Sequence, residues 1–111
     1  LKKMPYEEAK KTLCKFPGVG LKVADCMLLF GLGRLEAFPV DVWVKRILLK
    51  YYTGHFEEAF VKKLSCQKGF SDADYERLCG FGRRYFGAYA GYAQEYLYHY
   101  ERILNRKIEK G

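Results

Sequence analysis

The segment LCKFPGVGLKVAD, from Leu13 to Asp25, places Pro17 and two glycines between two apolar stretches. Proline has no amide hydrogen and disfavours helix in the residue before it, so a helix that precedes Pro17 must end there. Gly18 and Gly20 can take backbone conformations that other residues avoid, and they let another chain come close. The segment predicts a tight hairpin between two helices, around which the rest of the fold must be arranged.

Helical periodicity continues along the rest of the chain. Pro5 with the acidic residues after it is typical of a helix start, whereas the stretch before Pro39 is expected to be extended. No stretch has the pattern of a convincing strand. We therefore predict an all-α fold, a helical bundle over 1–111 that is one domain or a fragment of one. The expected helices cover 5–16, 21–31, 42–52, 56–65, 72–86 and the residues from Tyr89 onward.

The chain is basic, and its positive charge is concentrated in the first half. The formal net charge is +7; residues 1–50 hold ten Lys or Arg against five Asp or Glu, and residues 51–111 hold ten against eight. This excess near the hairpin suits a polyanion such as nucleic acid, although a basic surface also serves solubility alone. No apolar run approaches the roughly 18 residues of a membrane span, so we expect no membrane partner.

The four cysteines, Cys14, Cys26, Cys66 and Cys79, form no CxxC pair, and the two histidines stand alone. This spacing argues against a zinc site or an iron–sulfur cluster. The charged N-terminal stretch lacks the apolar core of a signal peptide. We therefore expect free thiols and an intracellular protein, cytoplasmic in a prokaryote and nuclear in a eukaryote.

The hairpin is a candidate anion site. The amides at Val19, Gly20 and the start of the following helix are expected to be unpaired and to point outward, where a DNA phosphate can accept from them. We assign Gly18, Val19 and Gly20 to phosphate binding, a contact that reads the DNA backbone and not its sequence. The alternative is a glycine-rich turn between helices that binds no ligand.

Two charged residues near the hairpin lie at positions that suit a catalytic role. Lys22 lies on the first turn of a helix, where a cation opposes the helix dipole, and either a phosphate salt bridge or use as an amine nucleophile would account for it. A helix N terminus and partial burial both disfavour the ammonium form of a lysine, as attack requires. Asp41 is the predicted N-cap of the helix after it. A capping carboxylate stays ionised and can stabilise a developing positive charge.

These residues stand in a longer stretch, LCKFPGVGLKVADCMLLFGLGRLEAFPVDVWVKRI, that resembles the helix–hairpin–helix DNA glycosylases with their Gly/Pro-rich loop and aspartate. The matching hairpin spans about 5–31. The resemblance implies that Lys22 and Asp41 are the catalytic pair. A second stretch, FGAYAGYAQEYLYHY from Phe86 to Tyr100, resembles the C-terminal helix of the 8-oxoguanine DNA glycosylase/AP lyase branch.

The same resemblance implies a base pocket. Gln94 matches the residue that hydrogen-bonds the Watson–Crick edge of the flipped base, Tyr98 the aromatic ring that stacks on it, and Cys26 the cysteine on its other side. Gln94 and Tyr98 are four residues apart on one helix and share a face, which by pattern alone would be polar and solvent-exposed. That face lies away from an unbroken apolar stripe of Tyr89, Tyr92, Ala93, Tyr96, Leu97, Tyr100, Ile103 and Leu104.

The resemblance further implies a structural monovalent or divalent cation at the carbonyls of Cys14, Phe16 and Val19, with no redox cofactor and no catalytic metal. Trp43 departs from the pattern, because relatives in this branch often have a phosphate-contacting histidine there. The branch with an iron–sulfur cluster has four clustered C-terminal cysteines, and this chain has none after Cys79. The chain matches the C-terminal portion of such an enzyme, without the N-terminal β-sheet domain that supplies one wall of the pocket.

From these features we expect a monomeric base-excision repair enzyme whose partner is duplex DNA containing oxidised guanine. The resemblance implies that it removes 8-oxoguanine by lysine attack on C1′, Schiff-base formation and β-elimination. One alternative is a glycosylase of the same superfamily that is monofunctional or acts on another damaged base. A second is a helix–hairpin–helix module that binds DNA without catalysis. A third is a helical protein-interaction module, whose binding would be insensitive to salt.

Overall fold

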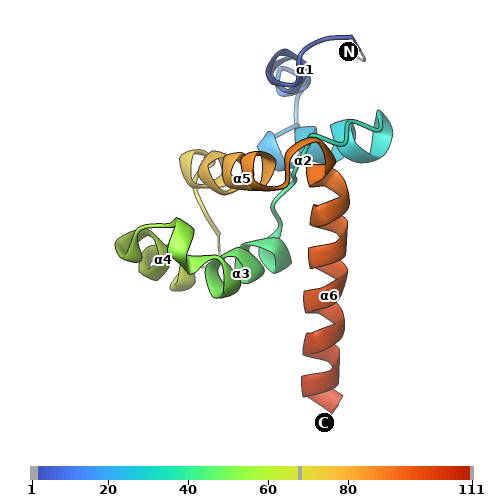
Figure 1. The fold of residues 1–111 in the computed structure, drawn as a ribbon. Helices are drawn as coiled ribbons and strands as arrows, with labels where there is room; N and C mark the ends of the chain where they lie inside the picture. The colour runs from blue at the N-terminus through green and yellow to red at the C-terminus, as the bar shows by residue number, and fades with distance from the viewer. Residues whose placement is uncertain (1–2, 68, 111) are drawn as a thin grey trace.

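The computed structural model describes residues 3–67 and 69–110, which form helices joined by short loops, with no strand among them (Figure 1). The all-α prediction is confirmed. Most helix bounds follow the expected ranges, but the first helix ends at Leu13 instead of continuing to Phe16. The helices are α1 Tyr6–Leu13, α2 Leu21–Cys26, η1 Met27–Gly31, α3 Val42–Tyr51, η2 Thr53–His55, α4 Glu58–Ser65, α5 Asp72–Phe86, η3 Gly87–Tyr89 and α6 Ala90–Lys110.

The hairpin between α1 and α2 is built on a type II turn. The carbonyl of Phe16 accepts from the N–H of Val19 at 3.2 Å, and Gly18 has a φ of +80°, as the third position of such a turn requires. The expectation that the Val19 amide is unpaired is therefore wrong, because that amide closes the turn. The amides of Gly20 and of the first turn of α2 precede the hydrogen bonds of the helix, and they remain the predicted phosphate donors.

After Cys26 the backbone widens into the π-helical turn η1. The N–H of Leu32 donates to the carbonyl of Met27, five residues earlier, at 3.1 Å. Turns of this kind are rare and occur frequently at functional sites. Here the turn buries Leu28 and Leu29 and leaves Phe30 exposed.

The buried side chains form two hydrophobic clusters. The first joins α3, α4 and α5 with Phe38 and Val40, and the second joins α1, α2 and η1 with Ala37. The extended segment 37–40 therefore passes from one cluster to the other. It leads directly into the N-cap of α3.

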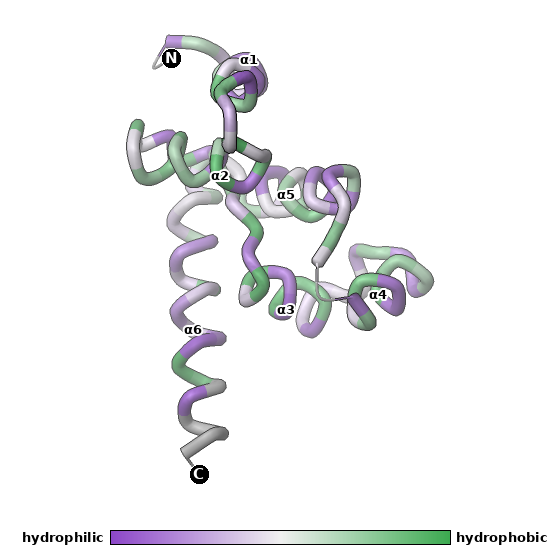
Figure 2. The backbone as a smooth tube through the Cα atoms, turned by 180° about the vertical axis from the view of Figure 1, so that it is seen from behind, coloured by the Kyte–Doolittle hydropathy of each residue, from purple (hydrophilic) through white to green (hydrophobic). Residues whose placement is uncertain are grey.

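The start of α6 is held close to η1 by a buried glycine. The N–H of Gly91 donates to the carbonyl of Leu35 at 2.6 Å, and a Cβ at this position would lie 2.3 Å from Leu29 Cδ1. Only glycine fits such an approach. From there α6 packs along α3 and α5 and, toward its C terminus, extends beyond the other helices (Figures 1 and 2).

The tyrosine stripe, which begins in η3 and continues along α6, lies largely in solvent. Tyr89, Tyr92, Tyr96 and Tyr100 are between 48% and 73% exposed, whereas Gln94 on the other face is 5% exposed. The hydropathy pattern alone would therefore have assigned the two faces of α6 the wrong way round. Among the described residues no helix is long and apolar enough to cross a bilayer.

Gly82 allows α5 to pack directly on the ring of Phe38, because a Cβ there would come within 2.1 Å of that ring. We predict that Gly82→Ala lowers the free energy of unfolding by about 1–3 kcal/mol, as overpacked cores do. Gly80→Ala is the matched control on the same helix, since its methyl group meets only the flexible side chain of Arg84. This control should gain up to about 1 kcal/mol from helix propensity. Urea denaturation measures both, and equal stability of the two variants would contradict the packing described.

Candidate active site

A cavity of about 260 Å³ opens between α2, the start of α3 and α6. All five residues predicted for catalysis and base binding line this cavity, although they come from three separate parts of the chain. The structure therefore brings the predicted groups together. The lining residues are Lys22, Cys26, Phe30, Pro39, Asp41, Gln94, Glu95, Tyr98 and His99.

Lys22 and Cys26 reach the cavity from consecutive turns of α2, as their four-residue spacing predicts. Lys22 is exposed, so the expected partial burial of this lysine is wrong for the residues that the structure describes. Cys26 is half-buried, and burial raises the pKa of its thiol. The charge of Lys22 opposes this shift, whereas the charges of Asp25 and Asp41 add to it. The charges of both members of the predicted catalytic pair therefore shift the pKa of the Cys26 thiol.

Asp41 caps α3, as predicted. Its Oδ1 accepts from the N–H of Val44 at 2.8 Å, while its own backbone is extended. The cap holds the carboxylate at the wall of the cavity that Lys22 also lines. A carboxylate fixed there can stabilise positive charge that develops beside the amine.

Gln94 gives the clearest sign that the cavity takes a polar ligand. Its side chain is nearly completely buried, and within the described residues its Oε1 has no hydrogen-bond partner. An unsatisfied buried acceptor costs about 1–3 kcal/mol, so a donor on a ligand would recover this cost. Tyr98, one turn further along α6, is half-buried, and its hydroxyl accepts from Arg102 Nη1 at 3.4 Å.

Four residues that the sequence reasoning did not select also line the cavity. Glu95 and His99 follow Gln94 and Tyr98 directly on α6, so their position could have been inferred once the buried face of that helix was known. Pro39 belongs to the extended segment before Asp41. Phe30 reaches the cavity from the π-helical turn, and no periodicity in the sequence predicts that turn.

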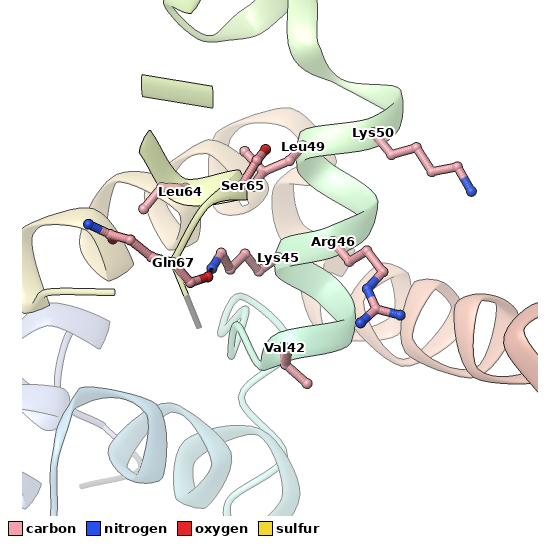
Figure 3. A pocket seen from close by; sticks show the side chains of 8 residues that line it. All are labelled: Val42, Lys45, Arg46, Leu49, Lys50, Leu64, Ser65 and Gln67. Carbon is pink, nitrogen blue, oxygen red and sulfur yellow. Dashed lines mark hydrogen bonds between the residues drawn. The ribbon is translucent and has the colours of Figure 1, made fainter. Parts of the chain in front are cut away.

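A larger cavity, of about 620 Å³, lies between α3 and α4 (Figure 3). Lys45 points across it toward Gln67, whose carbonyl accepts from the lysine Nζ at 2.7 Å, while Arg46 and Lys50 point away from it (Figure 3). Neither member of the predicted catalytic pair lines this cavity. A catalytic site is defined by reactive side chains that point into the same space, and its volume matters less. The smaller cavity is therefore the candidate active site.

The metal predictions concern the hairpin alone. In the described ranges, 3–67 and 69–110, no three His, Cys, Asp or Glu side chains gather as a metal site. The predicted cation would instead use the backbone oxygens of Cys14, Phe16 and Val19, which suit a hard cation. The Phe16 carbonyl accepts one hydrogen bond and keeps a second lone pair, so it fits that role. The cation itself stays a prediction.

Trp43 occupies the position at which a phosphate-contacting histidine was expected from the resemblance. Its ring is half-buried, and the guanidinium of Arg46 lies 4.8 Å from the ring centroid. A tryptophan ring cannot become a cation as an imidazole can. Trp43 therefore cannot make the charged contact with a phosphate that a protonated histidine makes.

A solved structure has the same fold as this chain. The structure of MBOgg1 in complex with a low-affinity DNA ligand matches it with a TM-score of 0.71 and 32% identity, over 94% of this chain and 30% of that chain. No protein-family model matches the chain. Its fold is that of the helix–hairpin–helix portion of an Ogg1-type DNA glycosylase.

Three curated relatives are similar to most of this chain. A probable N-glycosylase/DNA lyase of Methanothermobacter thermautotrophicus is 38% identical over 99 residues, which are 89% of this chain and 27% of that protein. The N-glycosylase/DNA lyase of Saccharomyces cerevisiae is 37% identical, over 84% of this chain and 27% of that protein. The N-glycosylase/DNA lyase OGG1 of Arabidopsis thaliana is 33% identical, over 88% and 24%. Over most of its length the chain is thus similar to proteins named N-glycosylase/DNA lyase, and it spans about a quarter of the length of these relatives.

Asp41 combines a cap with a charge, and two substitutions separate these roles. Asparagine caps a helix about as well as aspartate, so Asp41→Asn should change the free energy of unfolding by only a few tenths of a kcal/mol, roughly. Asp41→Ala removes the bond to Val44 and should cost about 1 kcal/mol. Urea denaturation distinguishes the two, and an equal loss in both variants would show that the cap is not formed.

The raised pKa of Cys26 predicts slow alkylation of its thiol at neutral pH, since the thiolate is the reactive form. Peptide mass spectrometry after iodoacetamide treatment should show Cys26 reacting more slowly than the exposed Cys66. Asp41→Asn should speed the reaction of Cys26, because it removes a charge that raises the thiol pKa. Lys22→Gln should slow it, because it removes the opposing charge. Identical rates in all three proteins would mean that these groups do not share the cavity.

Proposed function

We propose that the protein containing this chain is a bifunctional DNA N-glycosylase and AP lyase that removes 8-oxoguanine from duplex DNA. The observation that supports this most directly is the composition of the 260 Å³ cavity. It combines the amine of Lys22, the carboxylate of Asp41 and the unpartnered Oε1 of Gln94. A nucleophile, an anion for the developing positive charge and a polar group to read the base are what this reaction requires.

Binding begins at the hairpin. Beside the turn at Gly18, the amides of Gly20 and the first turn of α2 hold a DNA phosphate, and the basic first half of the chain attracts the duplex. The damaged nucleotide then leaves the stack, because its C1′ cannot be reached inside the helix. In the cavity, Gln94 bonds the edge of the base, while Tyr98 and Cys26 contact its two faces.

Base removal follows by substitution at the sugar. Lys22 Nζ attacks C1′, the bond from C1′ to the base breaks, and its electron pair leaves with the base, which takes up a proton. The Asp41 carboxylate stabilises the oxocarbenium-like positive charge that develops on the sugar. The C1′–O4′ bond then breaks and opens the sugar ring, O4′ takes up a proton, and loss of the protons from nitrogen leaves a Schiff base between Lys22 and C1′.

The lyase step uses the same lysine. Removal of a proton from C2′ sends its electron pair toward C3′, where the bond to the phosphate oxygen breaks. The strand is thereby nicked 3′ to the lesion, and hydrolysis of the conjugated imine releases Lys22. None of these steps is an oxidation or a reduction. A cation at the hairpin would hold the backbone turn and would take no part in them.

The test is borohydride trapping of the full-length protein with a duplex that contains 8-oxoguanine. Wild-type protein should give a covalent adduct, since borohydride reduces the Schiff base to a stable amine. Lys22→Gln should give none, whereas Lys50→Gln, which changes a lysine outside the cavity, should trap as wild type does. An adduct formed equally by Lys22→Gln would reject the assigned nucleophile.

Trapping, together with a measurement of DNA binding at increasing salt, separates the alternatives. DNA binding that weakens steeply with salt, without an adduct and without release of a damaged base from any duplex, would indicate a non-catalytic module. Base release without an adduct would indicate a monofunctional glycosylase. An adduct with another damaged base, and none with 8-oxoguanine, would keep the chemistry and replace the substrate. Binding that is insensitive to salt would argue against a DNA partner altogether.

A further inference from the structure

A buried polar cluster lies behind the cavity, among residues to which the mechanism assigns no role. Its centre is Asp25 of α2, whose side chain is 0% exposed. Its Oδ2 accepts from the Tyr75 hydroxyl at 2.6 Å and lies 3.0 Å from Lys10 Nζ, and its Oδ1 accepts from the Tyr6 hydroxyl. Tyr6 and Lys10 belong to α1 and Tyr75 belongs to α5, so three helices meet at one carboxylate.

The donors of this cluster are held in their protonated forms. Burial raises the pKa of Tyr6 and of Tyr75, and the nearby Asp25 and Cys79 raise both further. Burial also raises the pKa of Cys79 to about 12, so its thiol, 3.5 Å from the Asp25 carboxylate, remains a donor. Burial opposes the charge of Lys10, yet its neighbours outweigh this and its pKa lies above the ordinary value.

Such a cluster is a costly way to stabilise a fold. Charges lose their hydration when they are buried, and well-packed apolar residues often give as much stability as a buried ion pair. What hydrogen bonds add is direction, because they fix the orientation of the groups that they join. The cluster is therefore expected to orient the backbone segments that its hydrogen bonds join.

Tyr75 makes a second hydrogen bond, to the segment before α3. Its hydroxyl accepts from the N–H of Val40 at 3.4 Å, and Val40 directly precedes Asp41. On the other side of Tyr75, Asp25 lies one turn after Lys22 and directly before Cys26 on α2. One hydroxyl thus links the helix of the proposed nucleophile to the segment that carries the proposed carboxylate.

We propose that Tyr75, acting through Asp25 and Val40, is a positioning residue that sets the placement of the Lys22 amine relative to the Asp41 carboxylate. Neither Tyr75 nor Asp25 lines the cavity, so neither touches the substrate. The inference rests on the proposed function and adds to it the device that aligns its two reacting groups. Misplacement of such groups by about 1 Å can cost up to about a hundredfold in rate.

The test is Tyr75→Phe in the full-length protein, measured by single-turnover excision of 8-oxoguanine. This change removes only the hydroxyl and keeps the ring, which stacks on Phe70 at 5.8 Å between centroids. We expect the rate constant to fall roughly tenfold or more. The reaction amplitude, which reports the folded fraction, and the affinity for DNA should stay at the wild-type values.

Tyr52→Phe is the matched control, because Tyr52 is a half-buried tyrosine that packs edge-on against Tyr85 and Phe86, away from the cluster. It should react at the wild-type rate. A wild-type rate constant in Tyr75→Phe would overturn the proposal, as would a loss confined to the amplitude or an equal slowing in Tyr52→Phe. Each of these results leaves the proposed function intact if wild-type protein still traps DNA.

A second variant tests the link to Asp25. In Asp25→Asn the side chain keeps its shape and an acceptor but loses its charge. If the two residues act as one device, Asp25→Asn combined with Tyr75→Phe should slow the reaction by less than the product of the single effects. Multiplicative effects would overturn the link. Should Asp25→Asn fail to fold, Tyr75→Phe alone still decides the proposal.

Discussion

The carboxylate of Asp25 fixes how α1, α2 and α5 sit relative to one another. The two hydrophobic clusters supply most of the driving force for folding, but apolar contacts have no direction and tolerate rotation of one helix against another. Tyr6 comes from one cluster and Tyr75 from the other, and both donate to this carboxylate. The polar bonds therefore lie where the two clusters meet, and they select one arrangement among those that apolar packing would allow.

The cavity depends on that arrangement together with three local backbone devices. The type II turn with Gly18 sets where α2 begins, the cap of Asp41 sets where α3 begins, and Gly91 lets α6 begin against η1. Each device acts at the start of a helix, and α2, the N-cap of α3 and α6 each supply lining residues of the cavity. The placement of the side chains that line the cavity thus depends more on where the helices start, which single residues define, than on the helix interiors.

Much of this was predictable from the sequence, for physical reasons that differ between residues. Pro17, the two glycines and the cap at Asp41 are local signals, so the hairpin and the start of α3 could be predicted from nearest neighbours. The shared face of Gln94 and Tyr98 follows from helical spacing, but its burial does not. The aromatic stripe on the opposite face is more apolar and yet exposed, because burial depends on which neighbours are present and not on hydropathy alone. The Asp25 cluster joins residues far apart in the chain, and the π-helical turn after Cys26 has no periodic signature, so neither could be inferred.

The central claim is that one amine, that of Lys22, faces the sugar carbon in a cavity it shares with Asp41. The chain holds other lysines, among them Lys10 in the buried cluster and Lys45 in the larger cavity, where burial lowers the pKa of the Lys45 amine. Peptide mass spectrometry of the borohydride-reduced complex between the full-length protein and an 8-oxoguanine duplex locates the modified residue directly. We predict that the deoxyribose remnant is found on the peptide carrying Lys22 and on no other; a remnant on Lys10, Lys45 or any lysine outside the cavity would contradict the account.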